Sequence, residues 1–437
     1  MARDRLFAPR RRRRRVWPWL LLLAAAPALL VARPRIERRA PAREVEVVRE
    51  VLFTERAVPA PPPITAQSAI LIDADTGKIL YERQAHQRRP MASTTKIMTA
   101  LLALEHVRTN DIVVASEHAS RTPYTGLYLK PGEKLTAGDL LWALLLRSAN
   151  DACVAMGEHV AGSEEKFVEM MNARAQEMGL KNTHFMNPHG LHAEEHYSTA
   201  YDLAQMTRVA MQHPLFAEMV ARKRKRIDRS IEKQDVVVVN KNRLLFRWDA
   251  VDGVKTGYTR QAGHCLVASA SQDGWRLISV VLKSGNSWGD SRTLLEHGFR
   301  QYERVLVARK GTPLTQVRVT NGLQDSVQAM LLKDVSVVVP RGTKVDVRTE
   351  VTPGRARAPL WRGDSLGILV ARRGETELGR SLLLAADPVE PAPKPLLARF
   401  LFFGLVGFTG LLALSVVVRH GRKAAQSTGR RRRRFAP

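Results

Sequence analysis

The chain has 437 residues, 45% of them hydrophobic, which is enough for two or three domains with buried cores. A formal net charge of +27 would suit a nucleic-acid-binding protein. However, 15 of these net positive charges lie in residues 1–15 and 419–437, and the middle of the chain is only modestly basic. We therefore expect no nucleic-acid partner, and we expect the two tails to contact anionic lipid.

An uncharged apolar segment adjoins each basic tail. Residues 16–32 follow six consecutive arginines and are typical of a signal peptide or an uncleaved anchor. Residues 400–418 contain no charged side chain, and their length of 19 residues predicts a transmembrane helix. By the positive-inside rule both tails are cytoplasmic, so we expect the chain between the two segments to be extracytoplasmic.

The segments between these ends differ in pattern. Two strand-like runs flank a turn at 75–77, which predicts a β-hairpin. Residues 92–220 have helical patterns, and strand patterns return after Val236 in DVVVVN, GHCLVASAS and WRLISVVLK. This order predicts an α/β domain at 66–303, in which an antiparallel sheet from both ends of the segment is covered by helices from its middle.

Short strand patterns and turn sequences then predict a small all-β domain at 304–388. The expected organisation is a basic N-terminus with a signal peptide or anchor (1–32), a Pro-rich, charged linker (33–65), the α/β domain (66–303), the all-β domain (304–388), a linker (389–399), a transmembrane helix (400–418) and a basic cytoplasmic tail (419–437).

A candidate nucleophile lies at the start of the first helical run, in MASTTKIMTA. Ser93 and Lys96 are three residues apart, so a helix would place the hydroxyl and the amine side by side. The lysine can act as a base only when neutral, which requires burial or a nearby cation to lower its pKa from about 10.4. The helix that follows is apolar on most faces, so we expect Lys96 to be buried.

Two further motifs complete the pattern of a serine enzyme with a lysine base. RSAND supplies Ser148 and Asn150 after an apolar helix, and VDGVKTGYT supplies Lys255, Thr256 and Gly257 on a strand. Each motif alone is a weak signal. The order S-x-x-K, S-x-N, K-T-G in matching contexts is a strong one.

Other matches to these motifs lie in unsuitable contexts. Ser163 begins a charged helix, where we expect it to be an N-cap, and Ser230 lies in a highly charged stretch that offers no burial. Residues 283–286 imitate the second and third motifs but lie at the end of a strand. We therefore expect none of these residues to be catalytic.

With these motifs, residues 66–303 resemble the low-molecular-mass penicillin-binding D-alanyl-D-alanine carboxypeptidases. The likeness includes AILIDADTGKILYE, RSANDACVAMGEHVAGS, FMNPHGL and VDGVKTGYTRQAGHCLVASA, and residues 304–388 resemble that family's C-terminal domain. The implied fold is a β-lactamase/transpeptidase-like domain, a small all-β domain and a C-terminal transmembrane helix. Many family members end instead in an amphipathic surface helix, a difference that concerns anchoring and not chemistry.

The resemblance also implies a reaction at a bacterial cell membrane. Ser93 attacks the carbonyl between two terminal D-alanines of a peptidoglycan stem peptide while Lys96 accepts its proton, and water later hydrolyses the acyl-enzyme. Ser148 relays a proton to the leaving amine, and Asn150 holds the substrate amide and the lysine. A β-lactam acylates the same serine and leaves slowly.

The remaining roles fall on the K-T-G strand. Lys255 and Thr256 bind the terminal carboxylate, and the charge of Lys255 helps keep the catalytic lysine neutral. Gly257 lets the strand approach the ligand. The backbone N–H groups of Ser93 and Tyr258 form the oxyanion hole.

Three histidines and two cysteines could have other roles, as metal ligands or as a disulfide. His189, His192 and His196 include an i, i+4 pair, but H-E-x-x-H is absent and NPHGL is a structural loop in the resembling family, so we expect neither a metal nor a cofactor. Cys153 and Cys265 lie in apolar runs and are expected to be buried thiols, with a disulfide as the alternative.

Three alternative functions stay open on the sequence. A β-lactamase shares the motifs, but no E-x-x-L-N stretch lies between Asn150 and Lys255. A DD-endopeptidase that cuts peptide cross-links would use the same residues on a branched substrate. A non-catalytic wall-binding scaffold would keep the fold without turnover, which the intact Ser93, Lys96 and Lys255 disfavour.

Overall fold

The computed structural model describes residues 46–51, 59–231, 233, 236–343, 347–393 and 396–431. The expected signal or anchor segment at 16–32 lies outside the described residues. The helices are α2 (Lys96–His106), α3 (Glu117–Ser120), α4 (Ala137–Trp142), α5 (Asn150–Ala161), α6 (Glu164–Glu177), α7 (Ala200–Ala210), α8 (Pro214–Ala221), α9 (Ser287–Gln301) and α10 (Leu396–Arg431), with short helical turns at Ala92–Thr95, Ala143–Arg147 and Arg243–Phe246.

The strands fall into two groups along the chain. Those before α9 are β1 (Glu46–Val51), β2 (Ser68–Asp73), β3 (Ile79–Arg83), β4 (Ile112–Val114), β5 (Lys134–Thr136), β6 (Arg224–Arg226), β7 (Val237–Val239), β8 (Val251–Thr259), β9 (Gly263–Gln272) and β10 (Trp275–Ser284). Those after it are β11 (Tyr302–Ala308), β12 (Pro313–Thr320), β13 (Ser326–Leu331), β14 (Val335–Pro340), β15 (Val347–Pro353), β16 (Ala356–Arg357), β17 (Ser365–Arg373) and β18 (Thr376–Ala385).

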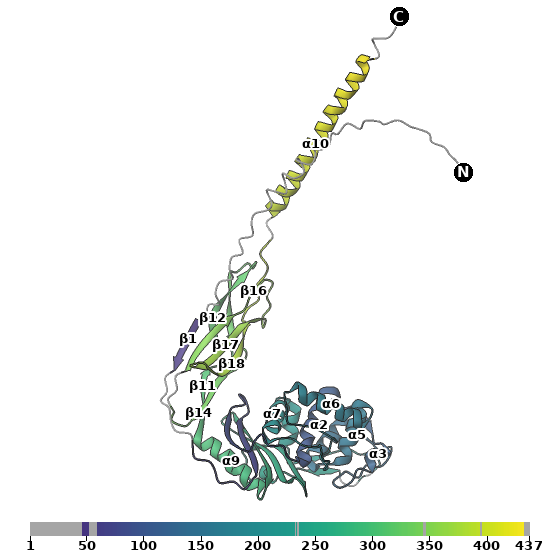
Figure 1. Ribbon diagram of the computed structural model, residues 1–437, viewed down its shortest axis with the longest axis vertical. Coiled ribbons are helices and arrows are strands. Elements are labelled where there is room, and N and C mark those ends of the chain that lie inside the picture. The colour runs from purple at the N-terminus through teal and green to yellow at the C-terminus, as the bar shows by residue number, and fades with distance from the viewer. Residues whose placement is uncertain are drawn as a thin grey trace, which may run out of the picture. The chain divides into compact units, whose positions relative to one another are not determined.

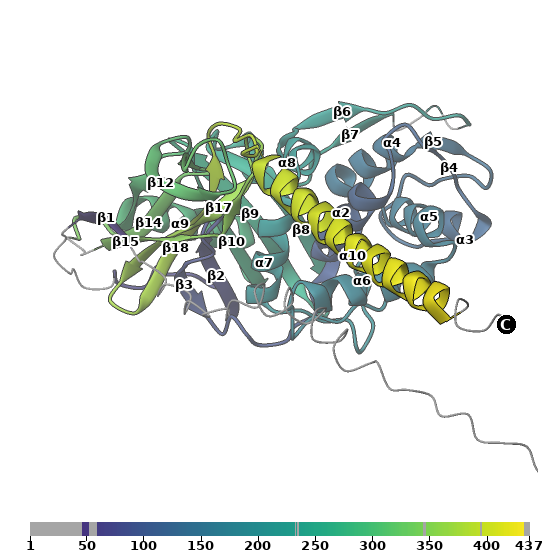
Figure 2. The same cartoon turned by 90° about the horizontal axis from the view of Figure 1, so that it is seen from above.

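A five-stranded antiparallel sheet forms the centre of the α/β domain. Its order is β3-β2-β10-β9-β8, so strands from both ends of the segment pair as expected. Side chains alternate between its two faces: Ile70 and Ile72 pack with the helices from the middle of the segment, whereas Leu71 packs with α9. Figures 1 and 2 both show α9 on one side of this sheet and α7, α2 and α5 on the other.

The helix that follows the S-x-x-K serine is central, as its apolar sequence predicted. Every residue from Lys96 to Ala103 is buried. The helix packs against α5 and α7, and the turn Ala92–Thr95 that precedes it packs against β8 and β9, so Lys96 lies between the helices and the sheet. Burial on all sides leaves the lysine side chain without access to bulk water.

Two details differ from the expected pattern. The range that we expected to be helical also contains the antiparallel pair β4–β5. The alternating burial of IVV in β4 is a strand signal too short to stand out in a helical stretch. Within the DVVVVN stretch Val237–Val239 forms a strand, β7, but β7 pairs with β6 and not with the central sheet. Figure 2 shows the β6–β7 pair apart from β2 and β10.

The second domain is built from strands, as expected. Its larger sheet has the order β1-β15-β17-β18-β13-β12-β16, and β11 pairs with β14 in a separate two-stranded sheet. Apolar side chains such as Val317, Val351 and Leu383 form its own core. The strand β1 at the edge of the sheet lies in the stretch for which we expected a linker.

The helix α10 contains an apolar stretch, Phe402–His420, whose side chains are exposed in the isolated chain. Within the described residues it is the one helix that is long and apolar enough to cross a membrane. It overlaps the predicted span at 400–418 and continues into the basic tail.

Candidate active site

The serine of the first motif lies on a 3₁₀ turn that runs directly into α2. The hydroxyl groups of Thr94 and Thr95 donate hydrogen bonds to the carbonyl oxygens of Met91 (2.7 Å) and Ala92 (2.8 Å). Both threonine hydroxyl groups therefore donate their protons within the turn. They leave the half-buried Ser93 as the hydroxyl that faces out of it.

Lys96 connects three parts of the chain. Its Nζ lies 3.1 Å from Oγ of Ser93, 2.8 Å from Oδ1 of Asn150 and 2.6 Å from the carbonyl oxygen of His189. Burial, followed by the charge of Lys241, lowers the pKa of Lys96 to about 8. At pH 7 such a pKa leaves about one amine in ten neutral, against about one in 2500 at the ordinary value. The lysine is therefore suited to accept the serine proton.

The S-x-N motif follows a helical turn at 143–147 that is wider than an α-helix. Ser148 ends this turn in the left-handed conformation with a φ of 66°, and its Oγ accepts a hydrogen bond of 3.0 Å from Nζ of Lys255. Asn150 begins α5, and its Nδ2 donates to the carbonyl oxygen of Pro123 (2.9 Å). The two motif side chains therefore contact the two lysines, one each.

The K-T-G motif lies on β8, at the edge of the central sheet. Lys255 is buried, and burial together with the charge of Lys96 lowers its pKa. A Cβ atom at Gly257 would lie 3.0 Å from the carbonyl oxygen of Met91 and 3.1 Å from the backbone nitrogen of Ser93, so glycine permits β8 to pack directly against the serine turn. Tyr258 is exposed, with its ring stacked on His264.

Hydrogen bonds join five of the predicted residues into two groups, one of Ser93, Lys96 and Asn150 and one of Ser148 and Lys255. The charges of the two lysines interact across these groups, and we call the five residues the serine network. The remaining residues of the K-T-G strand, 256–258, continue along β8 past the serine turn.

The loop MNPHGLHAEEH, whose NPHGL part we expected to be a structural loop from the family resemblance, supports the serine network. A Cβ atom at Gly190 (φ +87°) would lie 2.0 Å from the carbonyl oxygen of Ala92, so the loop closes against the serine turn only because this residue is glycine. His196 accepts a hydrogen bond from Met186 N at Nδ1, so its Nε2 donates to Thr95 Oγ1 (2.8 Å).

Burial keeps the two inner histidines of this loop neutral. It lowers the pKa of His189 and of His196 to about 3. Among the described residues there is no group of three or more His, Cys, Asp or Glu side chains placed to hold a metal ion. The rings of His189 and His196 each accept a backbone hydrogen bond within the loop, from Leu191 and Met186 respectively. The sequence feature that indicated a structural loop was the NPHGL likeness to the resembling family.

Both cysteines are buried free thiols, as expected, rather than a disulfide. The thiol of Cys153 donates to the carbonyl oxygen of Ala149 (3.2 Å), the N-cap residue of α5. Burial raises its pKa to about 12 and that of Cys265 to about 11. The reactive thiolate is therefore absent at neutral pH.

The competing motif matches have structural roles. Ser163 caps α6 by accepting a hydrogen bond from the backbone of Lys166, and Ser230 accepts one from the backbone of Lys134. Ser284 donates to Asp290 (2.6 Å). None of these hydroxyl groups has a hydrogen bond to a lysine amine in the described part of the chain.

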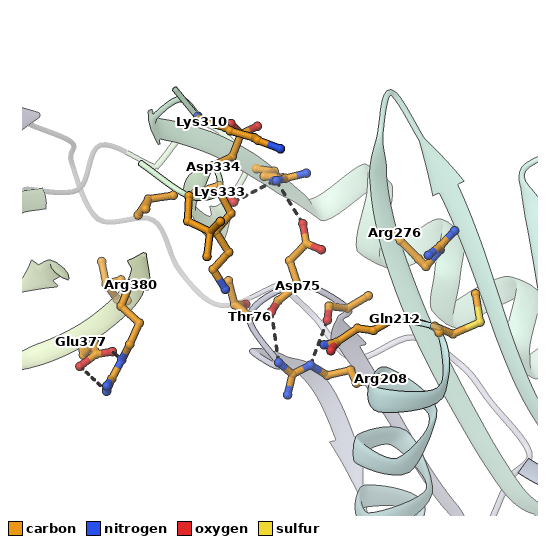
Figure 3. Close-up of a pocket in the computed structure, with 18 residues that line it drawn as sticks. Asp75, Thr76, Arg208, Gln212, Arg276, Lys310, Lys333, Asp334, Glu377 and Arg380 are labelled. Carbon is orange, nitrogen blue, oxygen red and sulfur yellow. Dashed lines mark hydrogen bonds and ion pairs between the residues drawn. The ribbon is translucent and has the colours of Figure 1, made fainter. Parts of the chain in front are cut away.

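A separate cavity of about 990 Å³ lies away from this network, between the loop after β2 and the strands of the second domain (Figure 3). Asp75 and Arg304 form an ion pair of 3.1 Å at its wall, and Arg208 donates to the carbonyl oxygens of Ala74 and Asp75. No residue of the serine network lines it. Although this cavity is large, it is therefore not the candidate active site.

An edge strand packed on a serine turn, with a buried lysine of lowered pKa beside the hydroxyl, is an arrangement typical of serine hydrolases that use a lysine as the base. Comparison with known proteins gives the family. Residues 55–286 match the family model described as D-alanyl-D-alanine carboxypeptidase, and residues 302–391 match the model of the penicillin-binding protein 5 C-terminal domain. The chain belongs to the D-alanyl-D-alanine carboxypeptidase family.

Individual relatives agree with this assignment. D-alanyl-D-alanine carboxypeptidase DacF of Bacillus subtilis is 37% identical over 339 residues, which cover 75% of this chain and 86% of that protein. DacC of Escherichia coli is 34% identical over 353 residues, covering 77% and 87%. The crystal structure of penicillin-binding protein 5 from Haemophilus influenzae has a TM-score of 0.62 and 32% identity, covering 76% of this chain and 99% of that one.

Proposed function

We propose that this chain removes the terminal D-alanine from peptidoglycan stem pentapeptides through an acyl-enzyme on Ser93. The observation that supports this most directly is the contact of 3.1 Å between Nζ of Lys96 and Oγ of Ser93, at a lysine whose pKa is about 8. The neutral amine accepts the serine proton as Oγ attacks the carbonyl carbon between the two D-alanines. The C–N bond then breaks, and D-alanine leaves with a proton on its amine.

The other network residues have complementary roles in this proposal. Ser148 passes a proton to the leaving amine, and its bond to Lys255 (3.0 Å) holds the hydroxyl in place. Lys255 and Thr256 bind the carboxylate of the leaving D-alanine. The N–H groups of Ser93 and Tyr258 stabilise the oxyanion, a contribution of about 3 kcal/mol per donor.

Deacylation and inhibition follow from the same arrangement. Water attacks the ester carbonyl, and the serine leaves with the proton returned by Lys96. A β-lactam presents a strained amide that resembles the D-alanine pair, so it acylates Ser93 and blocks the site.

We further propose that 66–303 is the catalytic domain and that it works outside the cytoplasm. The helix α10 would span the membrane through its apolar stretch, with the basic tail at 419–437 on the cytoplasmic side beside anionic lipid. The all-β domain at 304–388 would then separate the catalytic domain from the membrane.

The test is D-alanine release from a purified stem pentapeptide, measured beside cleavage of a cross-linked peptide dimer. The proposal predicts D-alanine from the pentapeptide. Cleavage of the dimer without D-alanine release would identify a DD-endopeptidase, and neither product would indicate a non-catalytic scaffold.

A further inference from the structure

A loop at 123–129 borders the serine network. The carbonyl oxygen of Pro123 accepts a hydrogen bond of 2.9 Å from Nδ2 of Asn150, and Oδ1 of the same amide accepts one of 2.8 Å from Lys96. A single side-chain amide therefore separates this loop from the catalytic lysine.

The loop is fixed to the start of α5 by its backbone. The N–H of Asn150 donates to the carbonyl oxygen of Thr125 (2.7 Å), and the carboxylate of Asp151 accepts from the N–H groups of Leu127 (3.0 Å) and Leu129 (3.1 Å). A Cβ atom at Gly126 would lie 2.7 Å from this carboxylate, so the close approach requires glycine. These bonds brace the loop, which forms a wall beside the serine network, against the start of α5.

Two tyrosines on this wall have an unfavourable backbone conformation and little burial. Tyr124 (φ 70°) and Tyr128 (φ 58°) both lie in the left-handed region, and their side chains are 78% and 59% exposed. That conformation is rare for bulky residues. The guanidinium of Arg147 lies over the Tyr128 ring at 5.9 Å from its centroid, but neither exposed ring is packed in a hydrophobic core. Such strain in a braced segment beside a reactive centre is typical of a ligand contact.

We propose that Tyr124 and Tyr128 form a subsite for the acyl-side part of the substrate, the stem-peptide residues that precede the scissile bond. The inference rests on the proposed function. The leaving D-alanine carboxylate is held at Lys255 and Thr256, so the peptide that remains on the serine meets Asn150 and then this wall. Tyrosine rings present large, rigid apolar faces, which suit the aliphatic part of a peptide side chain.

The test compares two substrates. The variant Tyr124→Asn removes the ring and keeps a residue that tolerates the left-handed conformation, and Tyr124→Phe keeps the ring. The ratio of kcat/KM for a stem pentapeptide to that for N-acetyl-D-alanyl-D-alanine is measured in each, with active enzyme titrated by penicillin. Trp361→Asn, which removes a 70% exposed ring from the second domain, is the control.

We expect Tyr124→Asn to lower this ratio about five- to tenfold through KM for the pentapeptide, and the double variant with Tyr128→Asn to lower it further. Tyr124→Phe and the control should keep the wild-type ratio. An unchanged ratio in the double variant, with the wild type active, would overturn the subsite and leave the proposed function standing. A wild type that releases D-alanine from neither substrate would contradict both.

Discussion

The ammonium nitrogen of Lys96 lies 2.8 Å from Oδ1 of Asn150, although the two residues are 54 positions apart in the sequence. This bond joins the first residue of α2 to the first residue of α5, so the S-x-x-K and S-x-N motifs meet at two helix starts. Backbone N–H groups at helix starts carry partial positive charge, which further disfavours the charged form of the lysine.

Replacement of the nucleophile should abolish activity without loss of stability. In Ser93→Ala we expect no D-alanine release and no penicillin adduct, and thermal unfolding close to that of the wild type, because a half-buried hydroxyl contributes little packing. Ser163→Ala is the matched control, since it removes another S-x-x-K serine that only caps α6 and should cost about 1 kcal/mol without affecting acylation. A large loss of stability in Ser93→Ala would count against its role.

The acylation rate should depend on pH through Lys96. Because burial lowers its pKa to about 8, the fraction of neutral amine rises as the pH increases through 8 and then levels off. We therefore expect the second-order rate of penicillin acylation to rise about tenfold per pH unit below 8 and to reach a plateau above it. A rate that is flat between pH 6 and pH 8 would show that this amine is not the base.

Gly190 should be intolerant of a side chain. In Gly190→Ala the new Cβ would lie 2.0 Å from the carbonyl oxygen of Ala92, which displaces the loop from the serine turn and moves the carbonyl of His189 away from Lys96. We expect acylation to fall at least a hundredfold. Gly162→Ala shares a positive φ (+86°) but has no atom within 4 Å, so it should lose only about 1 kcal/mol of stability. Equal losses of acylation in Gly190→Ala and Gly162→Ala would refute the steric explanation.

A buried ion pair that contacts the loop at 123–129 should contribute to the free energy of unfolding. Arg229 and Glu133 have fully buried side chains joined by two bonds of 2.9 and 3.0 Å, and Arg229 also donates to the carbonyl oxygen of Leu127 (3.0 Å). Glu133→Ala removes two charge-assisted bonds from a buried guanidinium, which should destabilise the fold by about 3–5 kcal/mol in denaturant unfolding. Glu117→Ala, at an exposed pair, should change it by less than about 1 kcal/mol.

Local sequence predicted the parts of the site that depend on local structure. The apolar run after Ser93 indicated a buried lysine, and the strand pattern around Lys255 placed the third motif on the sheet. The contact between the S-x-x-K and S-x-N motifs was predicted from the family resemblance alone, because spacing along the chain does not show that Asn150 reaches Lys96. The hydrogen bond from Lys96 to the carbonyl oxygen of His189 was not predicted, because a backbone oxygen has no sequence signature and its position depends on long-range packing.

The same limit applies to backbone conformations. The left-handed φ of Ser148 and of Tyr124 is set by contacts with distant segments, and neither residue type predicts it. Short strands such as β4 were missed because three residues give too little periodicity to outweigh the helical patterns around them.

The central claim is that Ser93 is the acylated nucleophile. Intact-protein mass spectrometry after incubation with penicillin, followed by peptide mapping, tests it most directly, with D-alanine release from a pentapeptide measured on the same preparation. We predict one penicillin adduct per chain, located on Ser93, together with released D-alanine. An adduct on another residue, or no adduct in a folded protein, would contradict the account.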